Sequence, residues 1–156
     1  MKLSYSDIYP GLTLTSEGYP VKQEEVIAFA SQWDPQPFHI DPVAARSSLF
    51  GKLAACGMHT QCIRGILQHR MPQQLDINAG LGAESVTLPK PVYPGDVLTL
   101  TVRVVDMRAS ASQPQRGIVR VEQIMRNQNR EVVLQQVAVV MMPIPTPSEL
   151  EEIDHA

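Results

Sequence analysis

The C-terminal half of the chain places apolar residues at every second position, and this pattern limits the possible folds more than any other feature. In VLTLTVRVVDM, residues 97–107, one face of a strand would carry Leu98, Leu100, Val102 and Val104. GIVRVEQIM and VVLQQVAVVMM continue this character, and the turn-forming segments RASASQPQRG and RNQNRE separate them. We therefore predict three consecutive antiparallel strands joined by hairpins or loops.

Helical patterns precede these strands. VKQEEVIAFASQW has apolar residues at helical spacing and glutamates near its start, where the helix dipole favours negative charge; Trp33, at its end, is expected in the core. A second helix is predicted in AACGMHTQCIRGILQHRM, which is sparsely polar and is therefore expected to be buried on more than one side. Its apolar set is Met58, Cys62, Ile63, Ile66, Leu67 and Met71. Helices followed by an antiparallel meander indicate an α+β fold with the helices on one face of the sheet.

Length, charge and cysteine content set the class of protein. The 156 residues suit a single domain over 1–156, with an acidic, proline-rich tail at about 143–156. The net charge of −3 gives no general reason to expect binding to nucleic acid or to an anionic membrane. No apolar run approaches the roughly 20 residues of a membrane span, and no secretory signal is visible. Cys56 and Cys62 would face different ways on a helix, so we expect no disulfide and a reduced, cytoplasmic compartment.

The stretch WDPQPFHIDP, residues 33–42, combines acid–base groups with prolines. Because proline stops helices and stiffens turns, we expect an irregular segment that begins where Asp34 ends the preceding helix. Asp41, followed by Pro42, suits the N-cap of a short helix. Asp34 has no explanation as complete as this one, and a rigid turn could bring it to one point with His39. The spacing alone also fits a turn residue and an unrelated histidine.

The order DPQPFHIDPVAA…FGKLAACGMHT resembles the hydratase motif of the MaoC-like family, the (R)-specific enoyl-CoA hydratases. The matching positions are Asp34, Pro37, His39, Asp41, Pro42, Phe50, Gly51 and Gly57. The later segment, with its Pro-Gly-Asp turn in KPVYPGD, looks like the sheet of that family, and the resemblance covers roughly residues 6–142. The chain departs from the pattern at Cys56, where the family often has histidine, and at Gly65, where some hydratases carry serine.

The resemblance implies a hot-dog fold, in which a curved antiparallel sheet wraps a long central helix, in a homodimer. It implies reversible addition of water to a 2-enoyl thioester, with Asp34 and His39 holding the water and Asp34 taking its proton. The backbone N–H of Gly57 would stabilise charge on the thioester oxygen. The predicted substrate contacts are Phe38, Cys56 and Met58. The substrate would be an acyl-CoA or related thioester, with coenzyme A as its carrier, and no other cofactor and no metal is expected.

Other functions stay open at this point. A hot-dog acyl-CoA thioesterase commonly carries a catalytic Asp or Glu on the central helix or in a neighbouring loop, and MHTQCIRGILQHRM contains no carboxylate. A non-catalytic protein that binds acyl thioesters would explain the departures at Cys56 and Gly65, but it would leave Asp34 and His39 as coincidence. A metal site is disfavoured because the ligand-type residues lack a recognised pair spacing. Those residues are His39, Asp41, Cys56, His59 and Cys62.

Overall fold

The computed structural model of the protein describes residues 1–146. Its helices are α1 (Gln23–Trp33), α2 (Pro37–Ile40) and α3 (Gly57–His69), with 3₁₀ helices at Tyr5–Asp7 and Ala44–Ser47. Its strands are β1 (Lys2–Leu3), β2 (Thr13–Thr15), β3 (Tyr19–Pro20), β4 (Gln74–Leu75), β5 (Ala79–Thr87), β6 (Val97–Ala109), β7 (Arg116–Arg126) and β8 (Val132–Pro143). Most of the acidic tail predicted at about 143–156 lies outside the described residues.

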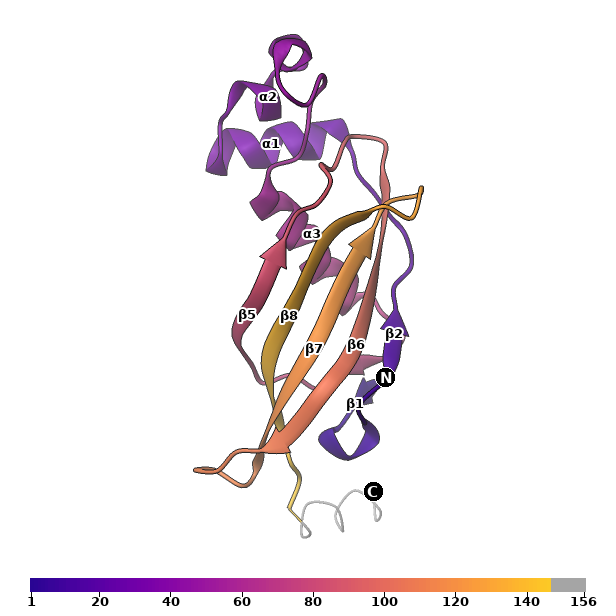
Figure 1. Cartoon of the computed structure of the whole chain (residues 1–156), viewed down its shortest axis with the longest axis vertical. Helices are drawn as coiled ribbons and strands as arrows, with labels where there is room; N and C mark the ends of the chain where they lie inside the picture. The colour runs from indigo at the N-terminus through magenta and orange to yellow at the C-terminus, as the bar shows by residue number, and fades with distance from the viewer. Residues whose placement is uncertain (147–156) are drawn as a thin grey trace.

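The main sheet has the strand order β2-β6-β7-β8-β5, and β3 also pairs with β6. The strands β6, β7 and β8 are consecutive antiparallel neighbours, which confirms the predicted meander. The strand β5, which was not predicted, pairs antiparallel with β8 and forms the edge of the sheet. In Figure 1 the sheet twists in front of α3, while α1 and α2 lie beyond one end of the strands. The shorter β1 and β4 form a separate parallel pair.

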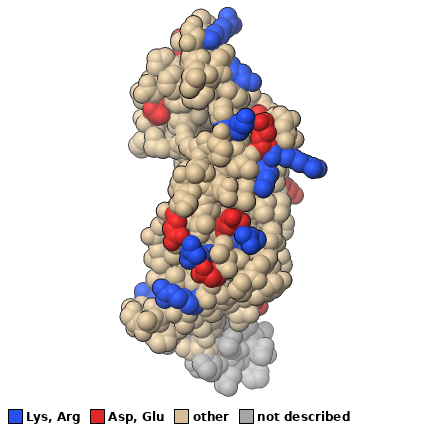
Figure 2. Space-filling model, in the orientation of Figure 1, with Lys and Arg blue, Asp and Glu red and all other residues tan. Residues whose placement is uncertain are grey.

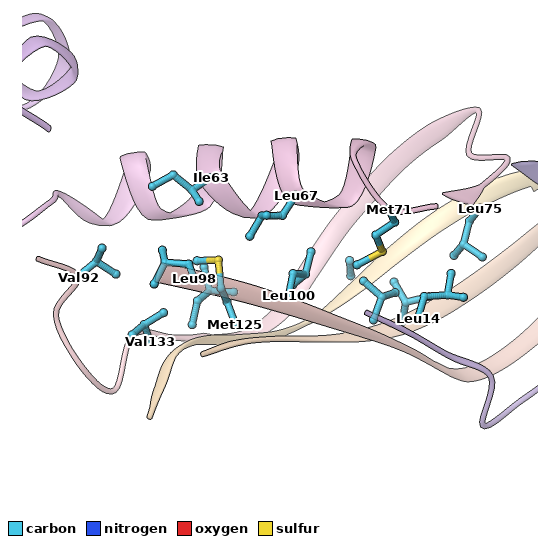
Figure 3. Packing of buried hydrophobic residues seen from close by; sticks show 14 of the residues in the cluster. Leu14, Ile63, Leu67, Met71, Leu75, Val92, Leu98, Leu100, Met125 and Val133 are labelled. Carbon is cyan, nitrogen blue, oxygen red and sulfur yellow. The ribbon is translucent and has the colours of Figure 1, made fainter. Parts of the chain in front are cut away.

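The core lies between the sheet and α3. The four alternating residues of β6 are each at most 2% exposed, as predicted: Leu98, Leu100, Val102 and Val104. Ile63 and Leu67 of α3, with Met71 just beyond its end, contribute to the same core (Figure 3). Burial of one such side chain is worth roughly 1.5–3 kcal/mol, so this interface is a main source of stability. A central helix packed in a curved antiparallel sheet is the hot-dog fold that the resemblance implies.

Two predictions about burial are wrong for the single chain. The helix α3 is not buried on more than one side, because Met58 is 52% exposed, Ile66 is 37% exposed and Cys62 is also exposed. These residues are four positions apart, so they form one exposed stripe along the helix. Trp33 is not in the core but is 61% exposed at the end of α1. Both cysteine thiols are free.

The outer face of the sheet carries charges in pairs. Arg103 contacts Glu122 at 3.0 Å, and Arg120 contacts both Glu84, at 2.6 Å, and Asp106, at 2.7 Å. Figure 2 shows basic and acidic atoms side by side on this face, so no large field of one sign forms there. Within residues 1–146, no helix combines the length and the apolar character needed to cross a bilayer.

Candidate active site

The stretch expected to be irregular contains one helical turn. Asp34 is the C-cap of α1, and its N–H donates to the carbonyl oxygen of Ala30 at 2.8 Å. Pro37 then begins α2 at the first helical position, where its missing N–H leaves no helical hydrogen bond unmade. The prolines therefore bend the chain between two helices rather than exclude a helix, and His39 lies within the second one.

This bend brings the side chains of Asp34 and His39 together. Nε2 of His39 lies 3.7 Å from Oδ2 of Asp34, which is longer than a direct hydrogen bond but lets one water contact both atoms. His39 is 7% exposed, whereas the side chain of Asp34 is 33% exposed. The pair thus joins a buried imidazole to a carboxylate that a ligand can reach.

The backbone of Ala54 sets the tautomer of His39. Nδ1 of His39 lies 2.6 Å from the carbonyl oxygen of Ala54. Because a carbonyl oxygen can only accept, Nδ1 carries the proton and donates. In the neutral ring Nε2 is therefore the acceptor, and it is the nitrogen that faces Asp34. Phe38 packs edge-on against the imidazole with 4.6 Å between ring centroids, and the centroid of Phe50 lies 6.1 Å away, so the ring is held in place.

The segment that holds His39 continues directly into α3. The N–H of Ala54 donates to the carbonyl oxygen of Phe38 at 3.1 Å, and that of Ala55 donates to the carbonyl oxygen of Val92 at 2.8 Å. Gly57 follows as the first residue of α3. In the part of the chain that is described, no hydrogen bond takes up the N–H of Gly57. A helix start with free amides is suited to bind a negatively charged oxygen.

The predicted substrate contacts differ in exposure. Phe38 is half-buried against the core, Cys56 is 1% exposed, and Met58 is 52% exposed. Cys56 is the N-cap residue of α3, and Met58 lies in its first turn. Of the three, Met58 presents the largest fraction of its surface to a ligand, and the binding roles of all three stay predictions.

Asp41 was predicted at the N-cap of a short helix, but it is the C-cap of α2, and the N-cap of the following 3₁₀ helix is Val43. Oδ1 of Asp41 accepts hydrogen bonds from the N–H groups of Val43, at 2.8 Å, and Ala44, at 3.2 Å. The short helix predicted here is the 3₁₀ helix Ala44–Ser47 rather than an α-helix. Among the described residues, no group of three or more His, Cys, Asp or Glu side chains is placed to hold a metal ion.

A polar cluster beneath α3 was not predicted. It consists of Gln61, Arg64 and Gln68 on the helix and Gln123 and Gln136 on the sheet. Gln123 and Gln136 are direct cross-strand partners and are only 1% and 4% exposed. The alternation of β7 and β8 places both glutamines on the inner face, among apolar residues. That break in the apolar pattern is the sequence signal that could have revealed the cluster.

Comparison with known proteins gives consistent matches. A family model described as a MaoC like domain matches residues 10–127. The crystal structure of a MaoC-like dehydratase from Rhodospirillum rubrum has 37% sequence identity and a TM-score of 0.86, covering 92% of this chain and 99% of that chain. The (R)-hydratase from A. caviae involved in PHA biosynthesis has 26% identity and a TM-score of 0.68, covering 87% of this chain and 98% of that chain.

A curated bacterial protein is also similar. The uncharacterized protein YdeM of Bacillus subtilis (strain 168) is 32% identical over 108 residues, which cover 69% of this chain and 73% of YdeM. The family model covers well over half of the sequence, and the Asp34–His39 pair lies inside the matched region. This chain therefore belongs to the MaoC-like domain family.

Proposed function

We propose that this protein is an acyl dehydratase of the (R)-specific enoyl-CoA hydratase type, which adds water reversibly to a 2-enoyl thioester. The observation that carries the proposal is the 3.7 Å separation between Oδ2 of Asp34 and Nε2 of His39, with Nδ1 of His39 occupied by Ala54. Similarity to a MaoC-like dehydratase and to an (R)-hydratase supports the same class of reaction.

In this reaction Asp34 and His39 hold one water beside the C2–C3 double bond. The carboxylate of Asp34 takes a proton from the water, the water oxygen bonds to C3, and the electron pair of the double bond moves onto the thioester oxygen. The N–H of Gly57 donates to that oxygen while it carries negative charge. The proton then passes to C2 and the carbonyl re-forms, so the product is a 3-hydroxyacyl thioester. The reaction needs no cofactor besides the coenzyme A that carries the acyl group.

Hydration of crotonyl-CoA, followed by loss of enoyl absorbance, tests the proposal. We expect turnover by the wild type and a rate about 10²–10⁴-fold lower in Asp34→Asn, the range for one positioned acid–base group. Asp76→Asn is the matched control, because it removes a carboxylate that pairs with Lys2 away from the site. Undiminished turnover in Asp34→Asn would contradict the mechanism. Release of free coenzyme A without hydration would instead identify a thioesterase, and binding without turnover would identify a binding protein.

The exposed edge of the sheet supports a homodimer as the working assembly. All nine residues of β5 are exposed, and within residues 1–146 the outer edge of β5 has no partner strand. An unpaired edge offers a row of hydrogen-bonding groups to another strand. Leu81 and Val86 of β5 are 50% and 47% exposed, and Met58 and Ile66 form an exposed apolar stripe on α3. Pairing of two β5 strands about a two-fold axis would give the backbone groups of this edge hydrogen-bond partners and would cover apolar surface.

A further inference from the structure

A cavity of about 600 Å³ lies between α3, β5 and the inner face of the sheet. From α3 it is lined by Gln61, Arg64, Gly65, Gln68 and His69. On the side of β5 its wall is made of small residues, so that part of the cavity offers space rather than contacts. Of the described residues that line it, none is acidic, although Arg64 supplies a positive charge.

Neutral amides hold Arg64 in this cavity. Nε of Arg64 donates to Oε1 of Gln61 at 2.9 Å, and Nη1 donates to Oε1 of Gln68 at 3.2 Å. The amide of Gln61 donates to Gln136, that of Gln136 to Gln123, and that of Gln123 to Gln68, each at 2.7 Å. The chain of glutamines therefore begins and ends at the arginine, and this closed ring fixes the direction of every amide and of the guanidinium.

The guanidinium lacks an anionic partner. Within residues 1–146 none of the ion pairs involves Arg64, and none of its hydrogen bonds uses Nη2. Burial lowers the pKa of Arg64 from its ordinary value, because removal from water penalises the charged form. Arginine nevertheless stays protonated in proteins, so the cavity holds a positive charge that only amide oxygens balance.

The cavity lies on the face of α3 that begins at Gly57. Gln61, Arg64 and Gln68 follow Gly57 by four, seven and eleven positions, which the helical period places on one side. At 1.5 Å per residue, Arg64 is about 10 Å along the helix axis from Gly57, and its side chain tilts back toward the helix start. A group bound by Arg64 would therefore lie a short acyl chain away from the thioester oxygen.

From this placement we infer that Arg64 binds a carboxylate at the far end of the acyl chain, so that the substrate is a short 2-enoyl thioester of a dicarboxylic acid. The inference rests on the hydratase function proposed above and adds the substrate class. A planar guanidinium suits a carboxylate through charge-assisted hydrogen bonds, and Nη2 is available to make one. A wholly apolar acyl chain would leave the charge of Arg64 facing it without an anionic partner. Gly65 adds room, since a Cβ there would meet nothing within 4 Å.

Binding of two saturated thioesters, which cannot be hydrated, tests the inference separately from catalysis. Glutaryl-CoA and valeryl-CoA have acyl chains of equal length and differ by a terminal carboxylate in place of a methyl group. By isothermal titration calorimetry, we expect the wild type to bind glutaryl-CoA about tenfold or more tightly, as for hydrogen bonds between charged groups. Arg64→Gln should lose this preference and still bind valeryl-CoA. Arg103→Gln, on the outer face of the sheet, should keep it.

The possible results separate the two proposals. Equal binding of both thioesters by the wild type, or a preference that survives in folded Arg64→Gln, overturns the inference and leaves the hydratase proposal standing. A preference for glutaryl-CoA in a protein that hydrates neither crotonyl-CoA nor glutaconyl-CoA overturns the hydratase proposal and supports the carboxylate site. If neither thioester binds, the inference is overturned, and the hydration of crotonyl-CoA alone then tests the hydratase proposal. Circular dichroism establishes whether each variant is folded. If Arg64→Gln does not fold, the affinities of the wild type for glutaryl-CoA and valeryl-CoA still test the inference.

Discussion

The imidazole of His59 stacks on the ring of Phe29, with 4.7 Å between ring centroids and 9° between the ring planes. His59 is 6% exposed, and among the described residues its Nδ1 has no hydrogen-bond partner. Burial lowers the pKa of His59 from its ordinary value of 6.5, and the nearby charge of Glu25 opposes this shift only in part. The folded protein therefore holds a neutral imidazole between α1 and α3, in the helical turn that Gly57 begins.

The free energy of unfolding should decrease on acidification because of His59. Between pH 6.5 and the lowered pKa, the unfolded state binds a proton that the folded state does not, so the stabilising contribution of His59 is complete above pH 6.5 and is lost as the pH falls below it. Urea unfolding at about pH 7.5 and about pH 5.5 should show a smaller loss in His59→Leu than in the wild type. His69→Gln, which alters an exposed histidine, is the control. Equal losses in the wild type and His59→Leu would contradict this account.

Substitution of His39 should separate a catalytic role from a structural one. His39→Ala should leave a folded protein whose kcat/KM for crotonyl-CoA is lower by at least about 10²-fold, because a positioned acid–base group is lost. Asp41→Ala should instead lower the free energy of unfolding by about 1 kcal/mol, because it removes the carboxylate that caps Val43 and Ala44. Rates are normalised to folded protein by near-UV circular dichroism. A larger loss of turnover in Asp41→Ala than in His39→Ala would show that the roles are assigned wrongly.

The N–H of Gly57 can be removed without removing the helix. Cys56 already has the extended backbone that proline requires of the preceding residue, and proline is favoured at the first helical position. A Cβ at Gly57 would lie 2.8 Å from Cδ1 of Leu88, so the change is best made together with Leu88→Ala. In that background Gly57→Pro should lower kcat by about 10²–10³-fold, as for loss of one oxyanion donor. Gly57→Ala keeps the N–H and should retain activity, and equal activity of the two variants would remove the N–H from the mechanism.

The exposed stripe on α3 should matter for assembly. Ile66→Lys places a charge where we propose that apolar surface is covered by a second copy, and burial of an unpaired charge costs several kcal/mol. The dissociation constant of the dimer should therefore rise by about 10²-fold or more, as measured by light scattering over a range of concentrations. Val43→Lys is the control, since Val43 is 69% exposed but lies outside both α3 and β5. A wild type that is monomeric at micromolar concentration would rule out the proposed dimer under those conditions.

The parts of the fold that were predicted are those with one buried and one exposed face. The strand β6 was found because its buried residues alternate, and α1 because its glutamates and apolar residues occupy separate positions. The strand β5 was missed because all nine of its residues are exposed in the single chain, so neither burial nor alternation marks it. Trp33 was wrongly predicted in the core, because the type of a side chain alone does not show whether it is buried in the core or exposed to solvent.

The candidate site was predictable only as a set of residues. Three prolines and three acid–base groups within ten positions indicated that Asp34 and His39 could meet, and the structure places their side chains 3.7 Å apart. The contact between the carbonyl oxygen of Ala54 and Nδ1 of His39 could not be predicted, because it joins residues fifteen positions apart through tertiary structure. The closed ring of hydrogen bonds around Arg64 was harder still to predict, because it joins α3 to β7 and β8 and depends on how these elements pack.

The pairing order of the sheet also bears on how the chain reaches its native state. The meander of β6, β7 and β8 needs only short loops to close, whereas β2 pairs with β6 across most of the domain, with Leu14 opposite Val102. Because the entropy lost on closing a loop grows with its length, the meander is favoured to form before the N-terminal strand docks. During synthesis β2 emerges early and must therefore wait for β6, one of the last strands, so the acid–base pair, built from early residues, gains its supporting sheet late.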